Sequence, residues 1–147
     1  MADSEGTTLP QHEIPIPKSI TIVLNQLYEL EQKTKKYDDP ANVSRNISKM
    51  KDALAEAGFP ASDYGSGQYS IGVAYEDPMG QSFNETRTDL EVNIAGSGTD
   101  DLVVVDVIKP IIRAILTNST GKFYQLVQKG IVTVESRKDT EKHDRND

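Results

Sequence analysis

Residues 40–60 read PANVSRNISKMKDALAEAGFP, and this stretch decides the fold class. Pro40 suits the first position of a helix, with Asp39 as its N-cap. Apolar residues then recur at alternating spacings of four and three, as one face of a helix requires: Val43, Ile47, Met50, Leu54 and Ala57. Gly58 supplies a left-handed stop, so the pattern predicts a helix over 40–57.

A second helical pattern lies just upstream. Ser19 is a candidate N-cap, and five apolar residues follow on one helical stripe: Ile20, Val23, Leu24, Leu27 and Leu30. Three lysines crowd the last turn, where cations interact favourably with the helix dipole. The pattern predicts a helix over 19–37. Because the linker of Asp38 and Asp39 is short, we expect both helices to pack antiparallel as a hairpin within 18–59.

The apolar stripes of this hairpin point to burial against something. One hairpin and one sheet would cover the stripes incompletely, whereas two hairpins pairing into a four-helix bundle would cover them. We therefore expect a homo-oligomer whose core or dimer stripe contains six residues: Leu24, Leu27, Val43, Ile47, Met50 and Leu54.

After Pro60 the apolar period changes from 3.6 to 2, which marks the start of strands. Apolar and polar residues alternate over 69–75 and again over 86–94, as in half-buried strands. Residues 102–108 are almost all apolar and β-branched, which predicts a central strand covered on both faces. Pro110 must interrupt or end that strand, because it cannot donate to a ladder.

The remaining pattern is less decisive. Residues 111–116 fit a strand or a short helix equally well, and 117–122 fit a turn. The segments 123–127 and 131–134 resemble strands that are broken at Gly130. Helices followed by a run of strands favour an α+β fold with a mainly antiparallel sheet. We expect the β-rich domain to span 66–136.

Composition supports polar tails around this folded centre. Hydrophobic residues make up only 36% of the 147-residue chain, below the globular average. Residues 1–17 hold three prolines and residues 137–147 have no apolar side chain, so we predict a mobile arm and a disordered charged tail. The isoleucines at 14 and 16 are expected to pack locally.

Charge and composition exclude several classes of partner. A formal net charge of −7 repels phosphate backbones, so we expect no nucleic acid. There is no cysteine, and no apolar run approaches the roughly 20 residues that a membrane span needs. Residues 1–5 (MADSE) lack a basic segment leading into an apolar core. We therefore expect a cytoplasmic protein that does not act at a membrane.

The sequence offers little for bond-making chemistry. Its only histidines, His12 and His143, lie in the predicted tails, where nothing holds them in catalytic geometry. The GSG sequence at 96–98 has no third glycine and no following helix, so it predicts a plain loop rather than a phosphate site. We expect no catalytic residue, metal or cofactor. Asp106 stands out because it interrupts an apolar strand, either at an edge or bulge or as a carboxylate facing a partner.

Four segments together resemble a known family. Residues 50–59 (MKDALAEAGF), 77–84 (DPMGQSFN), 103–110 (VVVDVIKP) and 127–134 (VQKGIVTV) resemble the segments of GrpE, the nucleotide-exchange factor of DnaK-type chaperones, in the same order. Ser82 stands where that family has a proline, and Ile111 where it has a glycine.

The resemblance implies a homodimer with bundled helices and a β-domain that inserts into the ATPase domain of a DnaK-type chaperone. It points to five candidate partner-binding residues: Gly80, Phe83, Asp106, Lys109 and Pro110. The sequence thus predicts a non-catalytic protein-binding module that resembles a co-chaperone. The alternatives are a structural or assembly subunit of phage or secretion type that forms homo-oligomers, and a small enzyme that uses Asp, Glu or Tyr.

Overall fold

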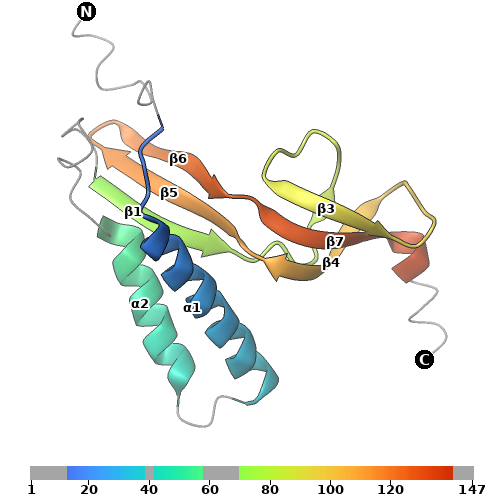
Figure 1. The fold of residues 1–147 in the computed structure, drawn as a ribbon, viewed down its shortest axis with the longest axis horizontal. Helices are drawn as coiled ribbons and strands as arrows, with labels where there is room; N and C mark the ends of the chain where they lie inside the picture. The colour runs from blue at the N-terminus through green and yellow to red at the C-terminus, as the bar shows by residue number, and fades with distance from the viewer. Residues whose placement is uncertain (1–12, 39–41, 58–69, 141–147) are drawn as a thin grey trace, which may run out of the picture. The chain divides into compact units, whose positions relative to one another are not determined.

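A computed structural model describes residues 13–38, 42–57 and 70–140. Two helices come first, α1 (Lys18–Lys36) and α2 (Val43–Ala57), and the strands follow. These are β1 (Ser70–Glu76), β2 (Ser82–Phe83), β3 (Leu90–Ala95), β4 (Leu102–Lys109), β5 (Ile111–Asn118), β6 (Gly121–Gln128) and β7 (Gly130–Ser136) (Figure 1). The predicted α+β class, with a helical hairpin before a mainly antiparallel β-region, is confirmed.

The chain divides into two compact units. Unit 1 comprises Met1–Tyr75 and Ile112–Val127, and unit 2 comprises Glu76–Ile111 and Gln128–Asp147. Among the described residues, unit 1 holds both helices and a sheet of order β1-β5-β6, whereas unit 2 holds a sheet of order β2-β4-β7-β3. The β-rich stretch therefore contributes to both units, and the chain passes between them three times.

The first helix starts one residue earlier than predicted. Pro17 occupies the N-cap position with no side-chain cap, and its carbonyl accepts the Ile20 N–H at 3.0 Å. The prediction of Ser19 as N-cap is wrong because the extended backbone of Pro17 already serves as the entry to the helix, which leaves Ser19 inside it. The three lysines of the last turn lie where they were predicted.

The second helix begins at Val43 and ends at Ala57. Asn42 has a positive φ of 55°, and its carbonyl accepts the Arg45 N–H at 3.1 Å, so the first described helical turn forms here, whereas the predicted first position, Pro40, lies outside the described residues. The predicted cap at Asp39 and the stop at Gly58 lie outside the described residues. The two helices lie side by side and run antiparallel, as predicted (Figure 1).

In unit 1 the ambiguous segment after Pro110 is a strand. β5 lies between β1 and β6 and contributes buried Ile112, Ala114 and Leu116 to the core. The turn into β6 is shorter than predicted, because the Asn118 side chain accepts the N–H groups of Thr120 and Gly121 at 2.9 and 3.2 Å. Such a side-chain turn needs few residues, so the strands continue almost to the tip.

In unit 2, β4 lies between β2 and β7, and Pro110 ends it as predicted. Its first half is buried, but Asp106 and Ile108 are exposed, so the prediction of cover on both faces holds only for its start. Register shifts beside residues 105 and 108 mark β-bulges or similar irregularities in β4. β3 pairs with β7 in parallel, whereas β4 pairs with both of its neighbours antiparallel.

Two other predictions fail in unit 2. The strand expected over 86–94 starts only at Leu90, because residues 84–87 form a turn. In this turn the Asn84 side chain accepts the Thr86 N–H, and the Asn84 backbone carbonyl accepts the Arg87 N–H. The break expected at Gly130 falls instead at residue 129, since Gly130 begins β7 and donates its N–H to the Asp89 carbonyl at 2.9 Å. A local turn overrides the alternating pattern at Asn84, whereas a contact with the distant Asp89 carbonyl accompanies the start of β7 at Gly130.

Both predicted tails are partly ordered. Residues 137–140 form a helical turn after β7, and Arg137 bonds to Asp101 through both its backbone N–H and its side chain. At the other end, residues 13–17 are extended and Ile14 is buried. Each segment is held by contacts to residues far away in the sequence, which a local reading of composition does not reveal. Residues 1–12 and 141–147 lie outside the described residues.

Candidate protein-binding surfaces

The register of the unit 2 sheet brings two of the predicted partner-binding residues onto one face. Asp106 pairs with Thr133 of β7, which pairs in turn with Asn93 of β3. Lys109 pairs with Ile131, which pairs with Glu91. Because paired residues point to the same side of a sheet, these two rows form one surface, here called the polar face. Asp106, Lys109, Asn93 and Glu91 are all exposed on it.

The other three predicted residues have different surroundings. Gly80 is exposed in a turn at a φ of +81°, a left-handed conformation that favours glycine, and its N–H donates to the Val104 carbonyl at 3.0 Å. Phe83 is half-buried and pairs with Leu102. Pro110 is fully buried, and its carbonyl accepts the Gln128 side chain at 3.0 Å. Pro110 therefore has a structural role, whereas Gly80, Asp106 and Lys109 can contact a partner.

A surface hollow of about 420 Å³ lies next to Gly80 in unit 2. Its walls come from the turn before β2, from the start of β4 and from the helical turn after β7: Gly80, Val103, Val104, Val105, Arg137 and Thr140. Arg137 also donates to the Ser82 hydroxyl at 2.9 Å, which fixes the side chain at the rim. A hollow with apolar walls and a charged rim can receive a large side chain of a partner protein.

The turn before β3 is held by Arg87, which sequence reasoning missed. Its guanidinium donates to both carboxylate oxygens of Asp89 at 2.9 and 3.0 Å, to the Gln81 side chain at 3.0 Å and to the Ser82 carbonyl at 3.1 Å. The hydrogen bond to Asp89 raises the pKa of Arg87 above its ordinary value. Nothing in the sequence around Arg87 marks it, since its partners come from two separate turns.

The helical hairpin in unit 1 buries only part of its predicted stripe. Leu24, Leu27 and Ile47 are buried and Leu54 is half-buried, so these four form the core side. Val43 and Met50 are 39% and 45% exposed. Of the predicted core or dimer stripe, Val43 and Met50 therefore lie outside the buried core of unit 1, and their place in a dimer contact stays a prediction.

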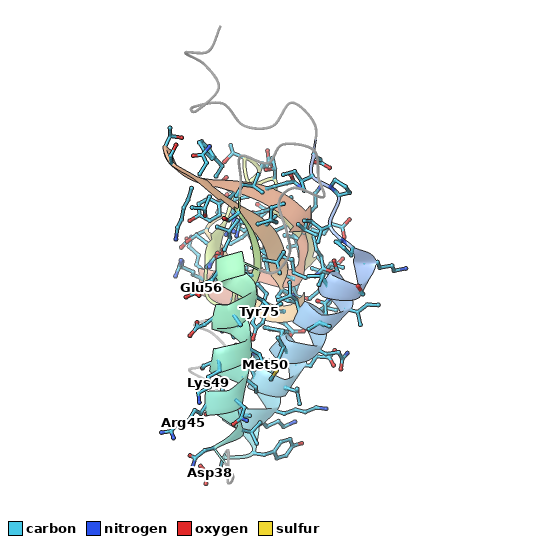
Figure 2. The ribbon with its side chains drawn as sticks, turned by 90° about the vertical axis from the view of Figure 1, so that its left-hand side faces the viewer. Asp38, Arg45, Lys49, Met50, Glu56 and Tyr75 are labelled. Carbon is cyan, nitrogen blue, oxygen red and sulfur yellow. The ribbon has the colours of Figure 1, made fainter. Side chains whose placement is uncertain are left out.

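These exposed residues belong to a repeated pattern. Val23 and Leu30 on α1 are seven residues apart and exposed, and so are Val43 and Met50 on α2. A seven-residue spacing keeps side chains on one side of a helix over successive turns. We call these four residues the apolar ridges. Figure 2 shows Met50 on α2, with the charged side chains of Arg45 and Lys49 projecting from the same helix away from α1.

A polar cluster joins the helices to β1 inside unit 1. Glu31 on α1 accepts hydrogen bonds from the Tyr75 hydroxyl at 3.2 Å and from Lys51 on α2 at 3.0 Å. The Lys51 ammonium lies 4.7 Å from the centre of the Tyr75 ring, and the Tyr28 ring meets that ring edge-on at 5.7 Å. Burial, followed by the negative charge of Glu31, raises the pKa of Tyr75 above its ordinary value.

This cluster is unsuited to catalysis by tyrosine. A raised pKa keeps the Tyr75 hydroxyl protonated, whereas a tyrosine base or nucleophile needs a lowered one. The neighbouring carboxylates of Glu76 and Asp77 are also engaged in structural contacts: Asp77 accepts the Met79 N–H at 3.0 Å and Glu76 accepts the Gln81 amide at 2.8 Å. Asp139 occupies the GSG loop, where the Gly98 N–H donates to its carboxylate at 3.2 Å. The predicted histidines lie outside the described residues.

Comparisons with known proteins add no assignment. No protein-family model, no curated protein and no solved structure matches this chain. Within the described ranges, no group of three His, Asp or Glu side chains could hold a metal ion. No helix in the part of the chain that the structure describes has the length and apolar character needed to cross a membrane.

Proposed function

We propose that this chain is a non-catalytic protein-binding module that forms a homodimer through its helical hairpin. The observation that carries the proposal is the pair of apolar ridges, Val23 with Leu30 and Val43 with Met50, which stay about 40% exposed at heptad spacing on both helices. A second copy presents the same ridges, so two hairpins can bury them together as a four-helix bundle.

The proposal extends to a partner of DnaK type. Two helices before a β-region, with the polar face and the hollow beside Gly80 both in unit 2, fit an exchange factor that resembles GrpE. Asp106 and Lys109 supply opposite charges for recognition, and the hollow supplies an apolar anchor point. Such a factor acts by differential binding: it favours the open form of an ATPase, and nucleotide affinity falls by linkage.

Sedimentation of wild type, Met50→Glu and Arg45→Glu at micromolar concentration tests the dimer. We expect the wild type and the Arg45 variant to sediment as dimers, since Arg45 lies off the ridge, and the Met50 variant to sediment as a monomer. A wild-type monomer contradicts the proposal. Rings or filaments would favour the alternative of an assembly subunit.

Release of a fluorescent nucleotide from a DnaK-type ATPase tests the partner. We expect the wild type to accelerate release, the double variant Asp106→Lys/Lys109→Glu to lose the effect, and Lys122→Glu, on β6 in unit 1, to retain it. A folded dimer that neither binds the ATPase nor changes release contradicts the exchange-factor reading and leaves the protein-binding reading in place.

A further inference from the structure

Residues 13–17 form an extended strap across one face of the unit 1 sheet (Figure 1). Ile14 is only 5% exposed, and it packs in a cluster with Ile71 of β1 and with Ala114 and Leu116 of β5. Ile16 is half-buried against the same cluster, beside Phe123 and Val127 of β6. Five side chains from three strands thus form a groove that accepts two isoleucines.

Gln125 of β6 holds the backbone of the strap. Its side-chain carbonyl accepts the Ile14 N–H at 2.9 Å, and its side-chain amide donates to the Ile14 carbonyl at 2.8 Å. A neighbouring β-strand would offer one residue the same donor and acceptor pair. The Gln125 side chain therefore binds the backbone of one extended residue, and it can do so whether that residue belongs to this chain or to another.

The positions of Pro15 and Pro17 indicate which peptide sequences can bind in the groove. Pro15 and Pro17 are exposed, so neither needs a pocket, and neither has an N–H group that would be left without a partner. Pro17 has φ −55° and ψ 136°, in the polyproline range. Proline restricts the free peptide to such extended conformations and so lowers the entropy cost of binding. A surface hollow of about 340 Å³ is lined by the strap and by residues 125–127 of β6.

We propose that this groove is a binding site for an extended partner peptide of the pattern Ile-Pro-Ile, and that residues 13–17 are a tethered competitor for it. The strap makes backbone hydrogen bonds through one clamped residue and leads directly into α1 at Lys18, so it can leave the groove without unfolding a helix. Tethering gives the strap an effective concentration in the millimolar range, which lowers the apparent affinity of any free peptide. The inference is independent of the proposed exchange activity.

Binding of a fluorescent peptide, EIPIPK, to full-length variants tests the proposal. The double variant Ile14→Ser/Ile16→Ser weakens the packing of the strap in the groove and leaves the five side chains that form the groove unchanged. We expect this variant to bind the peptide at least about tenfold more tightly than wild type, because the tethered competitor is weakened. Adding Gln125→Leu should abolish the gain, whereas adding Tyr124→Ala should not, since Tyr124 is an exposed neighbour that does not line the groove.

Absence of peptide binding to a freed variant that retains its circular dichroism spectrum overturns the proposal, as does equal binding after Gln125→Leu. A dimer that forms by exchange of straps between copies, and that Ile14→Ser/Ile16→Ser abolishes, would assign the groove to a second copy and also overturn it. If the double variant does not fold, chemical shifts of the wild type, measured by nuclear magnetic resonance with a large excess of the peptide, provide the test. We expect shifts at the Gln125 side-chain amide and the Ile14 amide, and their absence contradicts the proposal.

Discussion

Gly72 of β1 packs directly against the backbone of Ala55 in α2. A Cβ added at Gly72 would lie 1.8 Å from the Ala55 carbonyl oxygen and 2.5 Å from its carbonyl carbon. Both atoms belong to a helix backbone, which cannot rotate away as a side chain can. Gly72 therefore sets how closely α2 approaches the sheet of unit 1, and the sequence pattern of a half-buried strand gave no sign of this role.

We predict that Gly72→Ala destabilises the protein by about 1–3 kcal/mol, because α2 must move away from β1 and lose packing. Urea unfolding monitored by circular dichroism measures the change. Ser70→Ala serves as the control, because Ser70 lies on the same strand and is exposed, so it should leave the midpoint nearly unchanged. An unchanged midpoint for the Gly72 variant would mean that α2 does not sit against β1 as described.

Substitution of Gly130 can be compared with substitution of Gly72, because an added Cβ would meet side chains at Gly130 and a helix backbone at Gly72. Its added Cβ would lie 2.9 Å from Cγ1 of Ile111 and from Cδ2 of Leu90, which are side-chain atoms and can shift more easily than a helix backbone. We predict that Gly130→Ala costs about 1 kcal/mol and less than Gly72→Ala, since only side chains must adjust. The two urea midpoints, measured together, give the ranking, and the reverse order would contradict it.

The cluster at Tyr75 predicts a pH dependence at high pH. The folded state raises the pKa of Tyr75 above its ordinary value of 10.0, so the unfolded chain releases this proton first as the pH rises. Stability from this group is fully present below about pH 10 and is lost above it. We expect urea stability to fall more steeply between pH 9 and pH 11 for wild type than for Tyr75→Phe, in keeping with the ordinary tyrosine pKa of about 10. The prediction would be contradicted if urea stability fell equally steeply with pH in the wild type and in Tyr75→Phe.

Arg87 should not tolerate replacement by lysine. Its planar group donates to Asp89 through two nitrogens and to the Gln81 side chain as well, which a single ammonium cannot reproduce. We predict a loss of about 1–2 kcal/mol for Arg87→Lys, because these hydrogen bonds are partly shielded from water. Arg137→Lys is the matched control: its ion pair with Asp101 is largely exposed, so thermal unfolding should barely change.

The sequence predicts the order and type of the main elements because their apolar periods are long and clear. Val43 to Leu54 repeat at helical spacing, and residues 102–109 form the predicted strand ended by Pro110. The segment after Pro110 stayed ambiguous because buried apolar residues show no period. Only the ladder with its neighbours makes it a strand.

Other features depend on contacts between distant residues, which periodicity does not encode. Gln125 holds Ile14 across 111 positions, and Arg137 binds Asp101 across 36. The parallel pairing of β3 with β7 and the alignment of Asp106 with Thr133 likewise follow from the sheet register. The exposure of Met50 depends on how α2 packs against the rest of unit 1, and helical spacing alone does not give that packing.

The three passages of the chain between its units have a consequence for biosynthesis. The middle strand of the unit 1 sheet is β5, and in unit 2 the strand β7, which joins β3 to β4, is the last to be made. A ribosome must therefore deliver β6, which ends at Gln128, before the unit 1 sheet can close, and β7, which ends at Ser136, before the unit 2 sheet can close, and a nascent chain stalled before residue 130 exposes unpaired strand edges. Such edges attract other strands, so we expect holding chaperones to matter most until β7 has been made.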